Sequence, residues 1–296
     1  MPLLAFISRL ARRRESLFPT RALLGLARGV RDAMQTVSTN MDNGALPTCG
    51  IAVMAKASIA GRTKTRLVPP LTSEEAARCN TAFLLDIADN ILAASAQASI
   101  AGYIAFGPPH SRPFFEANLP SEVGLIDAWY ANFGDCLSCT IERLLERRHL
   151  GAVVLNSDSP TLPTSLLLKT AELLARPGDR AVLGPALDGG YYLLGVKTHH
   201  DRLFLDIAWS TERVTQQTLE RAAELDLPIH ILPTWYDVDD EVALKMLQAE
   251  LIEGQSFAPE LRPAPARHTR ALIQSLVEAA DLKERLACNA FRRAAE

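Results

Sequence analysis

The sequence predicts an α/β protein with a mostly parallel β-sheet covered by helices. From Ile51 to Leu251, short apolar segments alternate with segments of a dozen or more residues that have a helical period. The short segments are apolar on both faces, which is typical of parallel strands buried between two layers of helices. At 296 residues with 48% hydrophobic content, the chain is long enough to bury one large core.

The expected strands and helices follow one another along this region. Strands are expected at Ile51–Ala55, Ser99–Phe106, near Leu125, Ala152–Asn156, Ala181–Leu183, Tyr191–Val196 and Ile229–Leu232. Helices are expected at Ser73–Ser95, Asp135–His149, Ser165–Ala175, Glu212–Leu225 and Glu241–Leu251.

Three regions are expected along the chain: a basic leader at 1–47, the main domain at 48–253, and a linker with a C-terminal helical extension at 254–296. Seven arginines and two acids occur in the first 40 residues. This composition fits an amphipathic surface helix, a disordered leader, or a start codon placed upstream of a true start at Met41. The C-terminal helices are expected to pack on the main domain or on a partner, and an oligomer could form through them.

Charge and cysteine content exclude several classes of protein. The net charge of −3 argues against nucleic-acid binding, which needs a broad basic surface. Five cysteines, an odd number spread over a long chain, argue against a disulfide framework and favour a reducing, cytoplasmic location. No run approaches the roughly 18 apolar residues of a membrane helix, so we expect no transmembrane segment.

A basic loop follows the first expected strand. Its candidate binding residues are Lys56, Gly61, Arg62, Lys64 and Arg66, and the stretch contains no acid. A strand-to-helix loop often binds phosphate in an α/β protein, because backbone N–H groups and the positive end of the next helix converge there. The alternative is a solvated basic loop.

Aspartates follow two later strands. Asp158 comes at the carboxyl end of Ala152–Asn156, where a carboxylate can hold Mg²⁺ or Mn²⁺ against phosphate oxygens. Asp237 and Asp239 lie two residues apart, so an extended chain would point both to one side and let one or both complete that cation site. The alternatives are that Asp158, with Ser159, caps the turn or the next helix, and that Asp239 caps the helix from Glu241.

The sequence Asp188-Gly189-Gly190 precedes another strand. Two glycines allow either a close approach of the backbone to another group or a turn with positive φ, and Asp-Gly is also an ordinary hairpin signal. This motif alone therefore does not decide between binding and a structural turn.

The pair Cys136-x-x-Cys139 has a spacing found in zinc and redox sites. No second pair accompanies it, and both cysteines fall within an expected helix. Core packing is the favoured interpretation, with metal, redox and catalytic roles as alternatives.

The region from Ile51 to Leu251 resembles the radical-SAM/selenodomain-associated glycosyltransferase-like family, formerly a domain of unknown function, within the nucleotide-diphospho-sugar transferase (GT-A) superfamily. The matching motifs, in order, are KASIAGRTKTRL, FGD at Phe133–Asp135, SDSP at Ser157–Pro160, GPALDGGYYLLG, IAWST at Ile207–Thr211 and DVDD at Asp237–Asp240. The resemblance implies a three-layer α/β/α sandwich with a GT-A-like topology.

The resemblance also implies roles for individual residues. The basic loop would bind the phosphates of a nucleotide, with Lys64, Arg66 and Asp158 taking part in catalysis. Asp158 would be the first metal ligand and either Asp237 or Asp239 the second. Residues near the nucleotide or the acceptor would be Asp135, Asp188, Gly189 and Gly190.

The sequence therefore predicts a transferase that depends on Mg²⁺ or Mn²⁺ and uses a nucleotide-activated donor. The family resemblance favours transfer of a sugar from a nucleotide-sugar to a small-molecule acceptor. The many cations of the basic loop favour a nucleotidyltransferase that releases pyrophosphate. A non-catalytic nucleotide-binding protein on the same fold is a third hypothesis, and the acceptor and the base stay open.

Overall fold

The computed structural model describes residues 48–279 and 281–293, so the expectations for the basic leader lie outside the described residues. Its centre is a seven-stranded sheet in the order β3-β2-β1-β4-β6-β5-β7. The strands are β1 (Cys49–Ala55), β2 (Ile100–Phe106), β3 (Gly124–Asp127), β4 (Gly151–Leu155), β5 (Ala181–Pro185), β6 (Tyr191–Val196) and β7 (Ile229–Ile231). Only β6 runs antiparallel to its neighbours among these strands, which confirms the predicted mostly parallel sheet.

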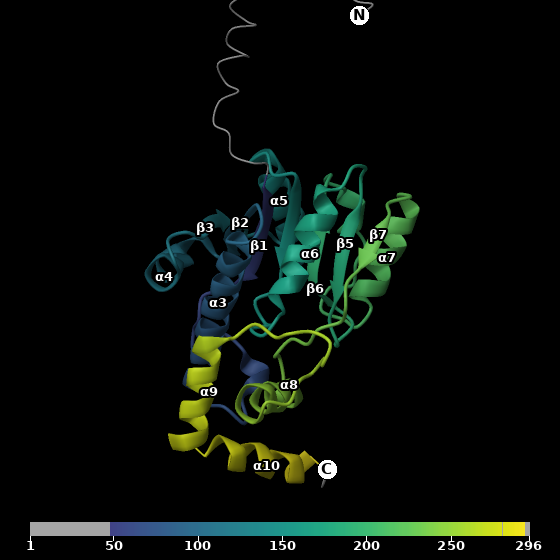
Figure 1. Ribbon diagram of the computed structural model, residues 1–296. Helices are drawn as coiled ribbons and strands as arrows, with labels where there is room; N and C mark the ends of the chain where they lie inside the picture. The colour runs from purple at the N-terminus through teal and green to yellow at the C-terminus, as the bar shows by residue number, and fades with distance from the viewer. Residues whose placement is uncertain (1–47, 280, 294–296) are drawn as a thin grey trace, which may run out of the picture. The chain divides into compact units, whose positions relative to one another are not determined.

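Helices cover both faces of the sheet (Figure 1). They are α3 (Ser73–Ser95), α4 (Arg112–Asn118), α5 (Phe133–Glu146), α6 (Thr164–Ala175), α7 (Val214–Glu224), α8 (Glu241–Gln248), α9 (Arg267–Ala279) and α10 (Leu282–Arg293). Short helical turns are η1 (Thr65–Leu67), η2 (Pro109–Ser111), η3 (Asp201–Leu203) and the π-helical η4 (Ala249–Glu253).

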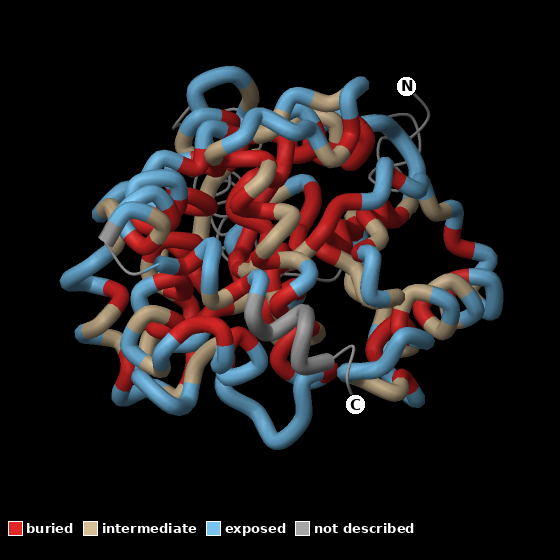
Figure 2. Tube along the Cα trace, turned by 90° about the horizontal axis from the view of Figure 1, so that it is seen from below, coloured by how far each residue is buried: buried red, intermediate tan, exposed pale blue. Residues whose placement is uncertain are grey.

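Two buried clusters separate the layers. Ile51 and Val53 of β1 face the cluster formed with α3 and α6, whereas Ala52 faces the cluster formed with α5 and α7. This alternation follows from the two-residue period of a strand. The resulting three-layer α/β/α sandwich agrees with the predicted fold class, and Figure 2 shows the buried segments surrounded by exposed loops.

Three local features go beyond the sequence prediction or differ from it. The link between β5 and β6 is too short for a crossover, so β6 returns as an antiparallel neighbour. Helix α5 begins at Phe133 rather than Asp135, because the side chain of Asn132 caps it by accepting the Asp135 N–H at 2.8 Å. The seven-residue helix α4 was not predicted, since it is too short to show a clear period.

The C-terminal helices pack on the main domain. Asp86 of α3 accepts the backbone N–H groups of His268 at 2.9 Å and Thr269 at 2.7 Å, and thereby caps the start of α9. Arg285 of α10 donates to Glu75 at 2.8 and 3.1 Å and to the Pro70 carbonyl at 3.0 Å. These bonds tie the extension to the segment that leads from the basic loop into α3.

None of the helices within residues 48–279 and 281–293 is both long enough and apolar enough to cross a membrane.

Candidate functional site

A cavity of about 600 Å³ lies at the carboxyl ends of four neighbouring strands. Its walls include Ala55 at the end of β1, Gly107 after β2, Ala128 after β3 and Leu155 at the end of β4. The chain order reverses across this edge, because β1 has β2 on one side and β4 on the other. Ligands of open α/β sheets bind at such a switch point.

The basic loop forms one wall of this cavity. The loop residues Lys56, Arg62 and Arg66 are exposed and line it. Asn80 of α3 donates to the Lys56 carbonyl at 3.1 Å and to the Ser58 hydroxyl at 2.9 Å. The loop is therefore anchored on α3 while its charged side chains stay open to a ligand.

Lys64 behaves differently from the other three cations. Its ammonium donates to Asp158 at 2.7 Å, to Asp239 at 2.8 Å and to the Val238 carbonyl at 2.9 Å. The Lys64 side chain is 5% exposed, and its backbone is left-handed, with φ of 54°. The structure thus joins the loop after β1 with the acidic segments after β4 and before α8.

The pKa values of these groups shift in different directions, because burial, which Lys64 only partly offsets, raises the pKa of Asp158. Burial alone would lower the pKa of Lys64, but Asp158 and Asp239 outweigh it and raise that pKa above the usual range. Burial would raise the pKa of Asp239, whereas Lys64 and Arg66 lower it overall. Lys64 and Asp239 are therefore both charged at neutral pH.

The capping alternative for Asp239 does not hold, because its neighbour Asp240 caps α8 by accepting the Ala243 N–H at 2.9 Å. Asp239 is left to face the cavity, where one of its oxygens lies 3.9 Å from Arg66. A backbone bond of 2.8 Å from Val238 N–H to the Asp158 carbonyl holds the two acidic segments together.

Six of the sequence-predicted site residues do not line the cavity: Gly61, Asp135, Asp188, Gly189, Gly190 and Asp237. Asp135 lies in the first turn of α5, where it accepts from the Asn132 amide at 2.6 Å. Asp188 accepts the Gly190 N–H at 2.8 Å and so closes its own turn. Burial, followed by the charges of Asp188 and Asp239, raises the pKa of Asp237 to about 7.

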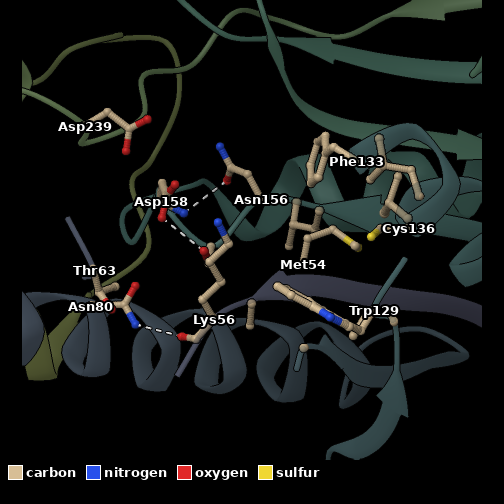
Figure 3. Close-up of a pocket in the computed structure, with 18 of the residues that line it drawn as sticks. Met54, Lys56, Thr63, Asn80, Trp129, Phe133, Cys136, Asn156, Asp158 and Asp239 are labelled. Atoms are coloured by element: carbon tan, nitrogen blue, oxygen red, sulfur yellow. Dashed lines mark hydrogen bonds between the residues drawn. The ribbon is translucent and has the colours of Figure 1, made fainter. Parts of the chain in front are cut away.

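The opposite half of the cavity is apolar and aromatic (Figure 3). It is lined by Met54, Trp129, Tyr130, Phe133 and Cys136. Trp129 and Phe133 are 55% and 49% exposed, which is unusual for large apolar side chains and marks them as available for contact. Sequence reasoning missed Trp129 and Tyr130, although their place shortly after the predicted strand near Leu125 was a usable signal.

The indole of Trp129 packs directly against the backbone of Gly107 in this wall. A Cβ on Gly107 would lie 2.4 Å from the indole Cε3, so only glycine at 107 leaves room for the ring. The aromatic wall is therefore shaped by the ends of both β2 and β3.

The two cysteines of the predicted motif lie in α5 as free thiols. Cys136 is buried and lines the cavity, and Cys139 is partly buried. Burial raises the pKa of Cys136, which disfavours the thiolate needed for metal binding or nucleophilic attack. The arrangement fits packing in the cavity wall.

A separate group of ligand-type side chains lies outside the cavity. Oxygen and nitrogen atoms of Asp86, Asp89 and His268 lie within 4.8 Å of one another. Asp86 already accepts two backbone N–H groups of α9, so its carboxylate has a structural role.

The oxygens around Lys64 also suit a metal. Carboxylates and a backbone carbonyl are the hard donors that Mg²⁺ and Mn²⁺ prefer, and Asp158, Asp239 and Val238 supply them at one point. The cavity thus combines basic side chains for phosphate with oxygen donors for a cation.

Comparisons with known proteins agree with this fold. The family model "Uncharacterized protein conserved in bacteria (DUF2064)" matches residues 90–211. A search of curated proteins found no match. Among solved structures, a protein from Desulfovibrio desulfuricans G20, provisionally assigned as a nucleotide-diphospho-sugar transferase, is 24% identical with a TM-score of 0.65. That similarity covers 78% of this chain and 98% of the other.

Two further structures are more distant. A cytidylyltransferase from Leptospira borgpetersenii serovar Hardjo-bovis (strain JB197) is 12% identical with a TM-score of 0.47, and 80% of this chain and 97% of that chain are covered. A CMP:2-keto-3-deoxy-manno-octonic acid synthetase complexed with CTP is 12% identical with a TM-score of 0.45, and 70% and 100% are covered. The chain therefore shares its α/β fold with the D. desulfuricans protein.

Proposed function

We propose that this protein is a divalent-metal-dependent transferase that uses a nucleotide-activated donor. The observation that carries the proposal is the shared cavity: Lys56, Arg62 and Arg66 from one loop face Asp158 and Asp239 from two others. Such a set of charges fits a diphosphate bound together with a cation. A basic loop far from Asp158 and Asp239 would not have supported the proposal.

In this proposal the basic side chains bind and orient the donor's phosphates. Asp158, Asp239 and the Val238 carbonyl would hold Mg²⁺ or Mn²⁺, and the bound ion would neutralise charge on the departing phosphate. An acceptor hydroxyl attacks the anomeric carbon and releases its proton to solvent, and the bond from that carbon to the phosphate oxygen breaks with its electron pair on the diphosphate. Arg62 and Arg66 then stabilise the charge that develops on this leaving group.

Nucleotidyl transfer is the second candidate, supported by the number of exposed cations. Three basic side chains open to one cavity suit a nucleoside triphosphate. Its leaving group is pyrophosphate, which carries more negative charge than the nucleoside diphosphate released from a nucleotide-sugar. Here the acceptor attacks the α-phosphorus instead of a sugar carbon.

Labelled donors separate the candidates. Release of nucleoside diphosphate from a nucleotide-sugar supports glycosyl transfer, and release of pyrophosphate from a nucleoside triphosphate on adding an acceptor supports nucleotidyl transfer. Suitable donors are first found by thermal-shift screening with Mn²⁺, since a ligand of the folded state raises its stability.

Asp158→Asn is expected to lower turnover by about a hundredfold or more, because it removes a charged group at the reacting phosphates. Asp201→Asn is the matched control, since Asp201 is an exposed acid that does not line the cavity. Full activity of Asp158→Asn would refute the proposed site. Nucleotide binding by wild type without turnover of any donor would refute catalysis and leave a binding protein.

A further inference from the structure

The ammonium of Lys64 occupies a site made of three oxygens, which we call the three-oxygen site: Asp158 Oδ1, Asp239 Oδ1 and the Val238 carbonyl. The distances from Nζ are 2.7, 2.8 and 2.9 Å. An ammonium has three N–H donors, so each donor has one acceptor here. The site is therefore a complete cation site with a side chain of the protein as its occupant.

The same oxygens are the ones the proposed function needs for Mg²⁺ or Mn²⁺. Two cations cannot share one set of oxygens at these distances, because each oxygen is already in contact with Nζ and like charges repel strongly in a buried place. An ion bound to both aspartates at this point must displace the ammonium.

We propose that Lys64 and a divalent cation are alternative occupants of the three-oxygen site, so that the cation enters only as Lys64 leaves it. This inference rests on the proposed function, and it adds Val238 as a backbone ligand and selects Asp239 over Asp237. Lys64 released from the aspartates would meet the phosphates of the donor, which bring new negative charge into the same cavity. Metal and donor binding are thereby coupled through one side chain.

The surrounding chain allows such an exchange. Lys64 has a left-handed backbone, with φ of 54° and ψ of 39°, that residues other than glycine rarely adopt. The three polar bonds of its ammonium offset the free-energy cost of that conformation. Once these bonds break, the backbone can leave the left-handed region and relieve that cost. Gly61, with φ of 72° and no atom within 4 Å of an added Cβ, leaves open space beside the loop.

The test measures Mn²⁺ binding without nucleotide, by calorimetry and by the electron paramagnetic resonance of free Mn²⁺. Lys64→Met removes the resident ammonium and is expected to bind Mn²⁺ about tenfold more tightly or better than wild type, because a site that is only partly available binds with reduced apparent affinity. Lys56→Met is the matched control: it removes the same charge from the same cavity but from an exposed side chain without these bonds. It is expected to change the affinity by less than about threefold.

Equal Mn²⁺ affinities of Lys64→Met and Lys56→Met would overturn the exchange. If Asp158→Asn still abolishes Mn²⁺ binding in that case, the metal site of the proposed function stands and only the exchange is lost. If neither wild type nor Lys64→Met binds Mn²⁺, both are refuted.

Lys64→Met leaves two partly buried aspartates without their counter-charge and can fail to fold. Lys64→Gln, which keeps a hydrogen-bond donor, is the second variant with the same expected gain. Wild-type crystals soaked in Mn²⁺ give an independent measurement. Lys64 displaced from both aspartates around a bound ion supports the exchange, whereas an ion bound to both aspartates while Lys64 stays bonded to them overturns it.

Discussion

Replacing Gly189 with alanine tests how closely the turn between β5 and β6 is bound to the segment before α7. Gly189 has φ of +87°, and an added Cβ would lie 2.2 Å from the carbonyl oxygen of Glu212 and 2.6 Å from its Cα. These are backbone atoms, so no rotamer change can relieve the contact. The turn also receives the Thr215 N–H on the Gly189 carbonyl at 3.0 Å, which holds both segments in place.

The expected cost has two parts. A side chain at positive φ costs about 1–2 kcal/mol, and overpacking against fixed atoms costs about 1–3 kcal/mol more. Gly254→Ala isolates the first part, because Gly254 has φ of +72° and nothing within 4 Å of an added Cβ. Gly189→Ala should therefore be less stable than Gly254→Ala by about 1–3 kcal/mol, or by about 2–12 °C in Tm for a protein of this size.

Urea denaturation followed by circular dichroism measures both variants against wild type. If the two variants lose the same free energy of unfolding within about 0.5 kcal/mol, the close approach to Glu212 does not exist as described. A larger loss for Gly254→Ala would contradict the reasoning more strongly, since only the positive φ is at stake there.

Two further predictions concern the extension and the aromatic wall. Burial would raise the pKa of Glu75, but Arg285 and the Thr72 N–H outweigh it and lower that pKa below the usual 4.5. The stability that the ionised Glu75 contributes to the folded state is therefore present above pH 4.5 and is lost as the pH falls through the lower folded pKa. Arg285→Gln should therefore lower the free energy of unfolding by about 1–2 kcal/mol at pH 7 and by little near pH 3, whereas Lys283→Gln, which removes an exposed pair, should have little effect at either pH. Equal losses for Arg285→Gln at both values would contradict the ion pair. Trp129→Ala should weaken donor binding about tenfold in calorimetry, whereas Trp129→Phe should keep most of the affinity. Gly107→Ala should resemble Trp129→Ala, because the added Cβ displaces the indole. Unchanged affinity in Trp129→Ala would exclude contact between this side chain and the donor.

The fold was predictable because its signals are local. The apolar strands and the periodic helices predicted the sheet and its layers, and α3 was placed at its observed bounds, Ser73–Ser95, where Thr72 and Glu75 form a capping box. The direction of β6 depends on the length of the link before it, which was readable in the sequence. The shift at the start of α5 depends on a single side-chain bond from Asn132, which a periodic pattern does not reveal.

The pairing inside the site could not be predicted from the sequence. Lys64 and Asp239 are 175 residues apart, and their contact needs a left-handed backbone at a lysine. The expectation that Asp237 and Asp239 point to one side assumed an extended strand. The segment around them lies outside the sheet, and of the two aspartates only Asp239 lines the cavity.

The balance of charge in the cavity indicates which form of the metal it would accept. Four basic side chains, Lys56, Arg62, Lys64 and Arg66, line it together with two acids, Asp158 and Asp239, which gives a net charge of +2. A bare divalent cation approaching this cavity is repelled, whereas a nucleotide that carries its own cation is attracted, because the complex is negative overall. Under the proposed exchange, Lys64 would stay bonded to both acids until that complex arrives, and the three exposed cations would meet the phosphates first. Mn²⁺ alone should therefore bind wild type weakly, and it should bind far more tightly when the correct donor is present. A donor that produces this increase in Mn²⁺ affinity is the substrate.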